Sequence, residues 1–291
     1  MPKIDDATCV RCGSCTEVCP LRIYVRTGEG IAVSAERGPL CRQCGHCMAV
    51  CPTQAVSVEG LSYEGFPALP ERLPPADEFA RLSLARRSIR HYRPDPVPRD
   101  VLERILEVAA QAPAGVPPTT VEVTVICDRE RLAELGPAAI KQLRRLQRAL
   151  RVPLLGWLLR RQLGPAFVSA MGSFIMPMVD TAERLWREQS VDMITWGAPV
   201  VMVFHSAPAG FCGQENCIIA ANHAMLAAHS LGLGTCWNGF IGGLLAYDRA
   251  MRVRMGIPAS NKVHAALLLG YPAGPTYRRA VPRAFRAVQW V

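Results

Sequence analysis

The chain has 291 residues, 50% of them hydrophobic, a formal net charge of +9 and twelve cysteines. This length is enough for one or two domains with a substantial core. The positive charge does not indicate nucleic-acid binding, because coordinating thiolates would lower it and no nucleic-acid-binding motif accompanies it. No signal-peptide segment and no run of about 18 apolar residues occurs, so we expect a cytoplasmic protein without membrane contact.

Eight of the cysteines form two matching patterns near the N-terminus. Residues 9–20 read CVRCGSCTEVCP and residues 41–52 read CRQCGHCMAVCP, so both are C-x2-C-x2-C-x3-C-P. A structural zinc site needs only four ligands, usually two C-x2-C pairs. A disulfide framework belongs to small secreted domains. The two complete four-cysteine runs instead predict two [4Fe–4S] clusters.

The spacing also predicts which cysteine binds which cluster. Three closely spaced thiolates bind three irons of one cubane, and the fourth, set apart by an extra residue and a proline, reaches the other cluster. We assign to cluster 1 Cys9, Cys12, Cys15 and Cys51, and to cluster 2 Cys41, Cys44, Cys47 and Cys19. Residues 1–60 resemble a two-cluster bacterial ferredoxin, and we call them the head.

A proline-rich connector follows the head. Residues 61–77 contain four prolines, which argue against a helix or a central strand. We interpret them as a stiff linker or as a strap on the next domain. Asp77 is expected to cap the helix that follows.

Residues 78–291 show alternating helical and strand patterns. Helices are expected twice within 78–112, through 137–195, at 215–231 and near 246–255, and strands at 121–127, 199–206 and 263–270. Asp128 is expected to cap the helix after the first strand. The helix at 215–231 is almost wholly apolar, so it belongs in a core or a dimer interface. This order predicts an α+β sandwich.

Five stretches of this region occur in the order and spacing of the FMN-dependent nitroreductase family. They are RRSIRHYRPDPVP (86–98), APAG (112–115), WGAPVVMVF (196–204), AAHSLGLGTCWNGF (227–240), and LGYP (269–272) with Arg278 and Arg279 after it. Residues 78–291, which we call the body, are therefore similar to this family. The resemblance implies an FMN-binding α+β sandwich, with a mostly antiparallel sheet flanked by helices, and a homodimer with FMN at its interface.

The resemblance also implies which residues hold FMN. Arg86 and Ser88 would bind the phosphate and ribityl end, with Arg87 beside them, because a phosphate needs cationic donors and guanidinium offers two at once. Arg90 would reach the pyrimidine edge and stabilise the reduced flavin. Arg278 or Arg279 would close over the phosphate. Composition alone would favour a solvated basic turn at 86–90.

The segment Trp237, Asn238 and Gly239 corresponds to the lining of the flavin N5 region in this family. The backbone N–H of Asn238 or Gly239 would bond N5.

The loop at 112–120 departs from the family pattern. Pro117 and Thr119 replace its usual asparagine and glutamine. Ala114 and Gly115 would then contact the partner subunit's flavin through backbone alone.

Two features have no assigned role. Cys212 and Cys217 lack a usual metal-ligand spacing, whereas Cys127 and Cys236 lie in apolar stretches and are expected to be buried. Residues 137–179 carry seven cations and no acidic residue around the apolar PLLGWLL (153–159). We favour a lid with a solvated basic face over contact with an anionic membrane or an acidic partner, because the apolar stretch is short.

The sequence therefore predicts an FMN-dependent oxidoreductase. Ferredoxin or another one-electron donor would supply the clusters, and FMN would deliver hydride to a small organic acceptor of the nitro, quinone, enone or halogenated aromatic class. No catalytic side chain is assigned, because hydride leaves from FMN N5 and a proton can come from water. Two alternatives are an electron-transfer module that serves a partner protein and an oxidase or dehydrogenase running in reverse.

Overall fold

The computed structural model describes residues 1–115, 120–209 and 212–291. Its internal contacts divide the chain into two compact units. Residues Met1–Pro74 make up most of the first, and most of the chain from Pro75 onward makes up the second. Each unit has its own hydrophobic core.

The head consists of short strands, short helices and the cysteine loops. Its two antiparallel ladders pair β1 (Lys3–Ile4) with β4 (Val56–Ser57), and β2 (Tyr24–Arg26) with β3 (Ile31–Val33). A 3₁₀ turn, η1 (Gly38–Leu40), precedes the second cysteine run.

Each cysteine run enters a short helix, α1 (Ser14–Val18) or α2 (His46–Ala49). The residue before each helix, Gly13 or Gly45, has a left-handed backbone with φ of 83° or 77°. Glycine adopts this conformation without strain, so both ligand loops depend on it.

The first residues of the expected connector pack on the head. In the 3₁₀ turn η2 (Tyr63–Gly65), the Tyr63 hydroxyl donates to the carbonyl oxygen of Val56 at 2.8 Å. The Phe66 ring lies against Gly45. Residues 67–75 remain as an exposed connector with four prolines.

Asp77 does not cap the helix after the connector, contrary to the sequence expectation. Helix α3 (Ala76–Ala85) has Pro75 at its N-cap, and no side chain caps it. Asp77 lies in the first turn, where its charge still complements the positive end of the helix dipole.

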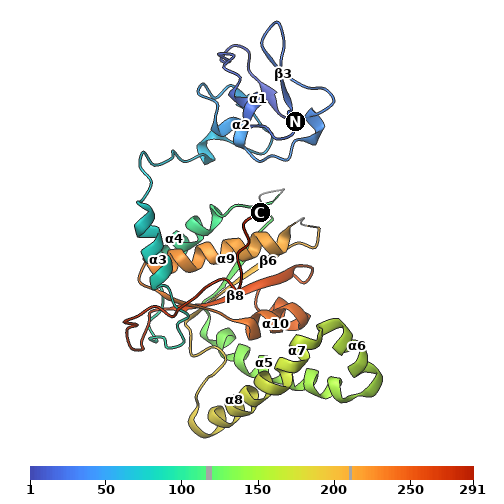
Figure 1. Cartoon of the computed structure of the whole chain (residues 1–291), viewed down its shortest axis with the longest axis vertical. Helices are drawn as coiled ribbons and strands as arrows, with labels where there is room; N and C mark the ends of the chain where they lie inside the picture. Colours follow the sequence, from blue (N-terminus) through green and yellow to red (C-terminus); the bar gives the residue numbers. More distant parts are fainter. Residues whose placement is uncertain (116–119, 210–211) are drawn as a thin grey trace. The chain divides into compact units, whose positions relative to one another are not determined.

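The body is built on a four-stranded antiparallel sheet (Figure 1). Its strand order is β5 (Glu122–Ile126), β6 (Val200–Ser206), β8 (Lys262–Gly270) and β7 (Gly234–Trp237). The ladder between β6 and β8 shifts register between Phe204 and His205. Ser88 forms an isolated parallel bridge with Thr235, so the segment after α3 lies along the outer edge of β7.

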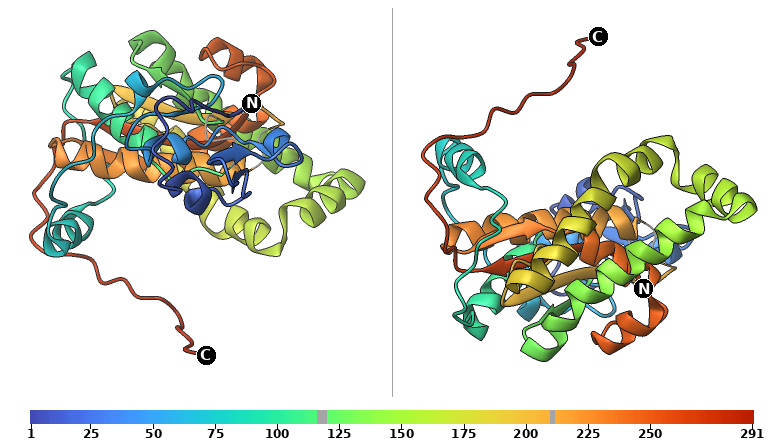
Figure 2. Two further views of the ribbon diagram at one scale, coloured as in Figure 1. Left: turned by 90° about the horizontal axis from the view of Figure 1, so that it is seen from above. Right: turned by 90° about the horizontal axis from the view of Figure 1, so that it is seen from below.

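Alternate residues of β6 serve two cores. Val200, Met202 and Phe204 pack with α4 (Arg99–Ala110) and α9 (Gly213–Ser230). On the opposite face, Val201 and Val203 pack with α5 (Arg129–Arg151), α8 (Met176–Gln189) and α10 (Gly239–Tyr247). Because helices cover both faces (Figure 2), β6 is buried along its whole length, which explains its continuous apolar run.

This architecture confirms the predicted α+β sandwich, with two differences in detail. The sequence interpretation missed both β7 and α10 as elements, and the helix expected near 246–255 is α11 (Arg249–Arg254). β7 has only four residues and α10 carries three glycines, which weakens both periodic patterns. Asp128 caps α5 as predicted, accepting a hydrogen bond from the N–H of Arg131 at 2.9 Å.

Between α5 and α8 the chain forms a helical projection. It contains α6 (Pro153–Leu163), α7 (Pro165–Ala170) and a π-helical turn, η3 (Met171–Ile175). Within the described residues, no single helix has the length and apolar content of a membrane span. The pair Pro153–Leu163 and Pro165–Gln189 reaches that length and composition together, but is bent by 114°.

Candidate functional site

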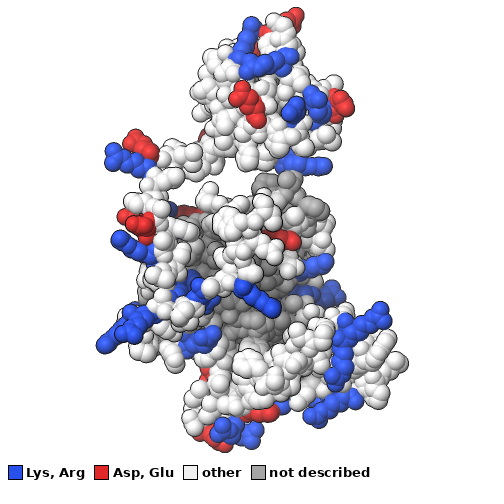
Figure 3. Space-filling view, viewed as in Figure 1, with Lys and Arg blue, Asp and Glu red and all other residues white. Residues whose placement is uncertain are grey.

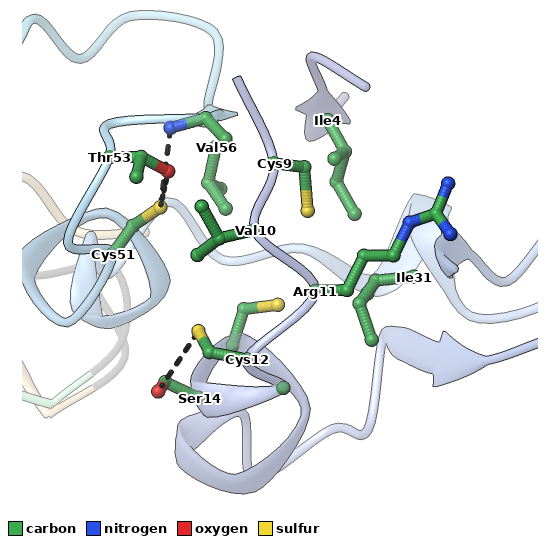
Figure 4. Close-up of a pocket in the computed structure, with 13 residues that line it drawn as sticks. Ile4, Cys9, Val10, Arg11, Cys12, Ser14, Ile31, Cys51, Thr53 and Val56 are labelled. Carbon is green, nitrogen blue, oxygen red and sulfur yellow. Dashed lines mark hydrogen bonds between the residues drawn. The ribbon is translucent and has the colours of Figure 1, made fainter. Parts of the chain in front are cut away.

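The four cysteines assigned to cluster 1 line one pocket of the head (Figure 4). Cys9, Cys12 and Cys15 come from the first run, and Cys51 comes from the second. Burial raises the pKa of the Cys15 thiol, and the three other thiols of the pocket add to this rise. The structure thus brings together side chains that are up to 42 positions apart in the sequence.

This pocket fits an iron–sulfur cubane rather than a single ion. Each of the four thiolates can bind a different iron, and the rest of the lining is largely apolar. Among the described residues, no three His, Cys, Asp or Glu side chains lie close enough to hold one metal ion. A zinc site would need its sulfurs about 2.3 Å from one point.

Hydrogen bonds reach two of these thiols. The backbone N–H of Ala55 donates to Cys51 Sγ at 3.2 Å, and Ser14 Oγ lies 3.4 Å from Cys12 Sγ. The Ser14 contacts lower the pKa of the Cys12 thiol. Both interactions favour the thiolate form that iron binds.

Three cysteines of cluster 2 gather at the start of α2. Burial raises the pKa of Cys47, with smaller contributions from Cys44 and Cys41. Cys19, the expected fourth ligand, ends α1 and packs in the same head core.

Tyr24 is a neighbour of this second group that sequence reasoning missed. Its buried hydroxyl donates a hydrogen bond to Cys47 Sγ at 3.1 Å. Its burial and the thiols around it raise its pKa, so the hydroxyl keeps its proton and stays a donor. No sequence signal distinguishes Tyr24 from an ordinary core tyrosine.

In the body, the segment from Arg86 to Arg90 is held against β7. The N–H of Ile89 donates to the carbonyl oxygen of Thr235 at 2.9 Å. Gly234 permits this approach, because a Cβ there would lie 2.7 Å from Ile89. Three of the predicted FMN residues, Arg86, Arg87 and Ser88, therefore lie in the segment that runs along the outer edge of β7.

Positive charge accumulates at this edge. Burial lowers the pKa of Arg86, and the positive charges of Arg283 and Arg87 lower it further. Burial also lowers the pKa of His229, and the positive charges of Arg86 and Arg87 lower it further. In the described part of the chain, no carboxylate forms an ion pair with these arginines.

One guanidinium atom at this edge also has no partner. Arg87 Nε is buried without a hydrogen bond within the described structure. A buried donor beside unbalanced cations would be stabilised by an anion. We call Arg86, Arg87, Ser88 and Arg283 the cationic cradle, and its chemistry fits a phosphate group.

The C-terminal cation that acts on Arg86 is Arg283, which the sequence interpretation did not name. Arg278 and Arg279 are exposed on the C-terminal segment 273–291, which runs as an extended trace in Figure 2. No sequence motif indicates where this segment lies, so the interaction of Arg283 with Arg86 could not be predicted from the sequence.

Arg90 lies beyond the cradle and stacks on an aromatic ring. Its guanidinium carbon is 5.3 Å from the ring centroid of Trp196, a cation–π contact. Trp196 belongs to the strand motif WGAPVVMVF, which does not indicate a contact with Arg90; that contact depends on the fold.

The predicted N5 segment lies where β7 passes into α10. The Asn238 N–H donates to the carbonyl oxygen of Ala266 at 2.9 Å, and its side-chain oxygen caps α10 through the N–H of Ile241 at 2.9 Å. Asn238 is therefore engaged within the chain. Gly239 is exposed, and a Cβ at this position would have no neighbouring atom within 4 Å. Trp237 is 37% exposed.

The remaining predicted residues lie apart from these groups. Ala114 is exposed and Gly115 is half-buried in the loop after α4, and Pro117 and Thr119 fall outside the described residues. Cys217 and Cys236 are buried. Cys127 is exposed, contrary to expectation, because it follows the end of the edge strand β5.

Comparison with known proteins gives the same division of the chain. Residues 84–271 match the nitroreductase family, and residues 8–56 match a 4Fe–4S dicluster domain. An NADH dehydrogenase from Thermus thermophilus is 28% identical over 209 residues, which cover 72% of this chain and 93% of that protein.

Two solved structures are similar to the body. A nitroreductase with bound FMN from Bacteroides fragilis has a TM-score of 0.54 and 24% identity, covering 73% of this chain and 98% of its own. A nitroreductase with bound FMN from Desulfitobacterium hafniense has a TM-score of 0.51 and 20% identity, covering 74% and 98%. At these identities they establish the fold.

These comparisons support both cofactor predictions: FMN is bound in the similar nitroreductases, and the dicluster match supports the iron–sulfur clusters. The family match covers well over half of the chain. The chain therefore belongs to the nitroreductase family, as an oxidoreductase whose N-terminal domain is of the 4Fe–4S dicluster type.

Proposed function

We propose that the chain reduces a small organic acceptor by two electrons, using FMN that receives single electrons from two [4Fe–4S] clusters. The observation that carries this proposal is the short tether between a cysteine-lined head and the body that contains the cationic cradle. The nine residues 67–75 span at most about 30 Å when fully extended. Such a tether keeps the donor at a high effective concentration near its acceptor without a tight interface.

Each part of the proposed flavin site has a role suited to its chemistry. Arg86, Arg87 and Arg283 would bind the phosphate, and the Ser88 hydroxyl would contact the same end. Arg90 would leave Trp196 to place its charge at the pyrimidine edge. FMN, when bound, joins one-electron supply to hydride transfer.

At the other end of the flavin, we propose that the backbone N–H of Gly239 bonds N5. The described hydrogen bonds engage the Asn238 N–H with Ala266 but give the Gly239 N–H no partner. Trp237, partly exposed beside it, would line the acceptor site. These groups would bind FMN and orient the acceptor beside it, and none of them has to transfer a proton.

A homodimer with FMN at its interface is proposed from the surface of α9. The inward face of this helix is buried, with Ala221 inaccessible to solvent. Its outward face leaves Ile218 exposed at 38%, and Leu226, two turns further along, half-buried. In the proposed dimer, the partner subunit would cover these two side chains. Ala114 and Gly115 would then approach FMN of the partner subunit.

Anaerobic turnover tests the proposed reaction. Holoprotein would be supplied with reduced ferredoxin or with NAD(P)H, and offered nitroaromatics, quinones, enones and halogenated phenols. The proposal expects at least one class to be reduced by electron pairs, with the clusters required when a one-electron donor is used. Oxidation of the flavin by a redox protein but by none of these compounds would favour an electron-transfer module instead.

A further inference from the structure

Helix α6 presents large apolar side chains that the described chain does not cover. Leu154, Trp157 and Leu158 are 73%, 57% and 52% exposed. Gly156 is the one buried residue of this helix, because a Cβ there would lie 2.4 Å from the carbonyl oxygen of Leu150 in α5. The helix therefore approaches the end of α5 most closely at Gly156, and Leu154, Trp157 and Leu158 face outward.

Positive charge surrounds this apolar surface. Residues 137–179 contain no acidic residue. Of their seven cations, Arg144 is paired with Asp180 and Glu183. Within the described structure the other six form no ion pair; they are Lys141, Arg145, Arg148, Arg151, Arg160 and Arg161. Figure 3 shows Lys and Arg without Asp or Glu over the outer part of this projection.

Apolar and cationic groups share the same exposed surface. The Arg161 guanidinium lies 5.9 Å from the ring of Trp157. Trp157, Arg160, Arg161 and Val168 also line one open groove between α6 and α7. A lid would bury one face of its helix against the body, whereas the main contacts of α6 in the described structure are with α5 and α7. The outer face of α6 is thus open to a contact outside the described chain, and the lid interpretation stays a prediction.

We propose that α6 and α7 dock on an anionic lipid surface. The leucines and Trp157 would enter the boundary between headgroups and acyl chains, and the six unpaired cations would meet anionic headgroups. An eleven-residue helix is about 16 Å long and can lie within the interface. An acidic protein would need a matching apolar patch as well, whereas an anionic bilayer supplies both charged headgroups and an apolar layer.

Vesicle binding by the holoprotein tests this proposal. We compare phosphatidylcholine vesicles with vesicles that also contain phosphatidylglycerol, by co-sedimentation. Wild type should bind the anionic vesicles and not the neutral ones. The double variant R160Q/R161Q should bind them roughly 30-fold more weakly. The control R249Q/K262Q removes two exposed cations elsewhere on the body and should bind as wild type does.

Apolar contacts are tested separately with W157A/L158A, which should lose vesicle binding while keeping its melting temperature and cofactor content. Failure of wild type to bind anionic vesicles would overturn the proposal. Equal weakening of the two charge variants would also overturn it, because binding would then follow net charge alone. If W157A/L158A instead dissociates a dimer, a second copy covers α6 and the proposal is wrong.

Discussion

The head and the body specify their sites by different kinds of information. In the head, all expected ligands are one residue type at fixed spacing, and the pocket of Cys9, Cys12, Cys15 and Cys51 joins both runs. In the body, the cradle brings Arg86 and Arg87 together with Arg283, almost 200 positions later, and depends on β7. A metal site whose ligands are all cysteines can be predicted from a sequence motif. A flavin site whose residues are brought together by backbone contacts and packing cannot.

The strongest test of this contrast removes one thiolate. Cys51→Ala should abolish cluster 1, although the three other ligands come from the first run. Iron and acid-labile sulfide should fall from about eight to about four per chain. Cys127→Ala, which removes an exposed thiol outside both cysteine groups, should leave both contents unchanged. Equal iron in the Cys51→Ala variant and wild type would reject the assignment of Cys51.

The cradle predicts a smaller, graded loss. Arg86→Ala should weaken FMN binding by on the order of 2–3 kcal/mol, because it removes a charge-assisted phosphate contact. Riboflavin, which lacks the phosphate, should bind both proteins almost equally. Arg81→Ala, an exposed arginine on α3, is the matched control. Isothermal titration measures the FMN and riboflavin affinities of all three proteins, and an unchanged FMN affinity in Arg86→Ala would remove Arg86 from the site.

The hydrogen bond from Tyr24 to Cys47 predicts an effect on the reduction potential of cluster 2. This hydrogen bond strengthens as the cluster gains negative charge, so Tyr24→Phe should lower the midpoint potential of cluster 2. A bond worth about 1 kcal/mol corresponds to roughly 40 mV for a one-electron couple. Tyr247→Phe is the control, since it removes the hydroxyl of an exposed tyrosine in the body. An EPR-monitored titration that finds both variants shifted alike would contradict this role.

The smallest expected effect concerns acid stability of the body. His205 is buried, with Nε2 at 2.9 Å from Thr124 Oγ1 and Nδ1 at 2.9 Å from Asn261 Nδ2. Burial lowers its pKa below the ordinary 6.5. The neutral form is thus favoured in the fold, so stability is complete above pH 6.5 and falls as the pH drops below it.

The expected loss is on the order of 1 kcal/mol for each unit by which the pKa is lowered. Thermal melts of the body across this range should show it, and His205→Gln should flatten the slope. An equal slope in the variant would show that His205 does not contribute.

The same contrast explains what the sequence could and could not predict. The strands at β6 and β8 were readable because their long apolar runs are buried on both faces. β7 and α10 were not, because the first is short and the second is rich in glycine. Arg86 to Arg90 were named from family position, but Arg283 and Trp196 needed the fold. The N–H of Asn238 or Gly239 was named as the flavin donor, and only the structure shows the Asn238 N–H bonded to Ala266.

Stopped-flow reduction of the flavin tests whether electrons reach it through the head. Wild type and Cys15→Ser, both loaded with FMN and matched in occupancy and melting temperature, would be mixed with a reduced one-electron donor. We expect fast flavin reduction in wild type, and severe loss of it in the variant, with FMN retained. Turnover from chemically pre-reduced FMN should survive in both. Flavin reduction that is equally fast in the variant would show that the head is not the route.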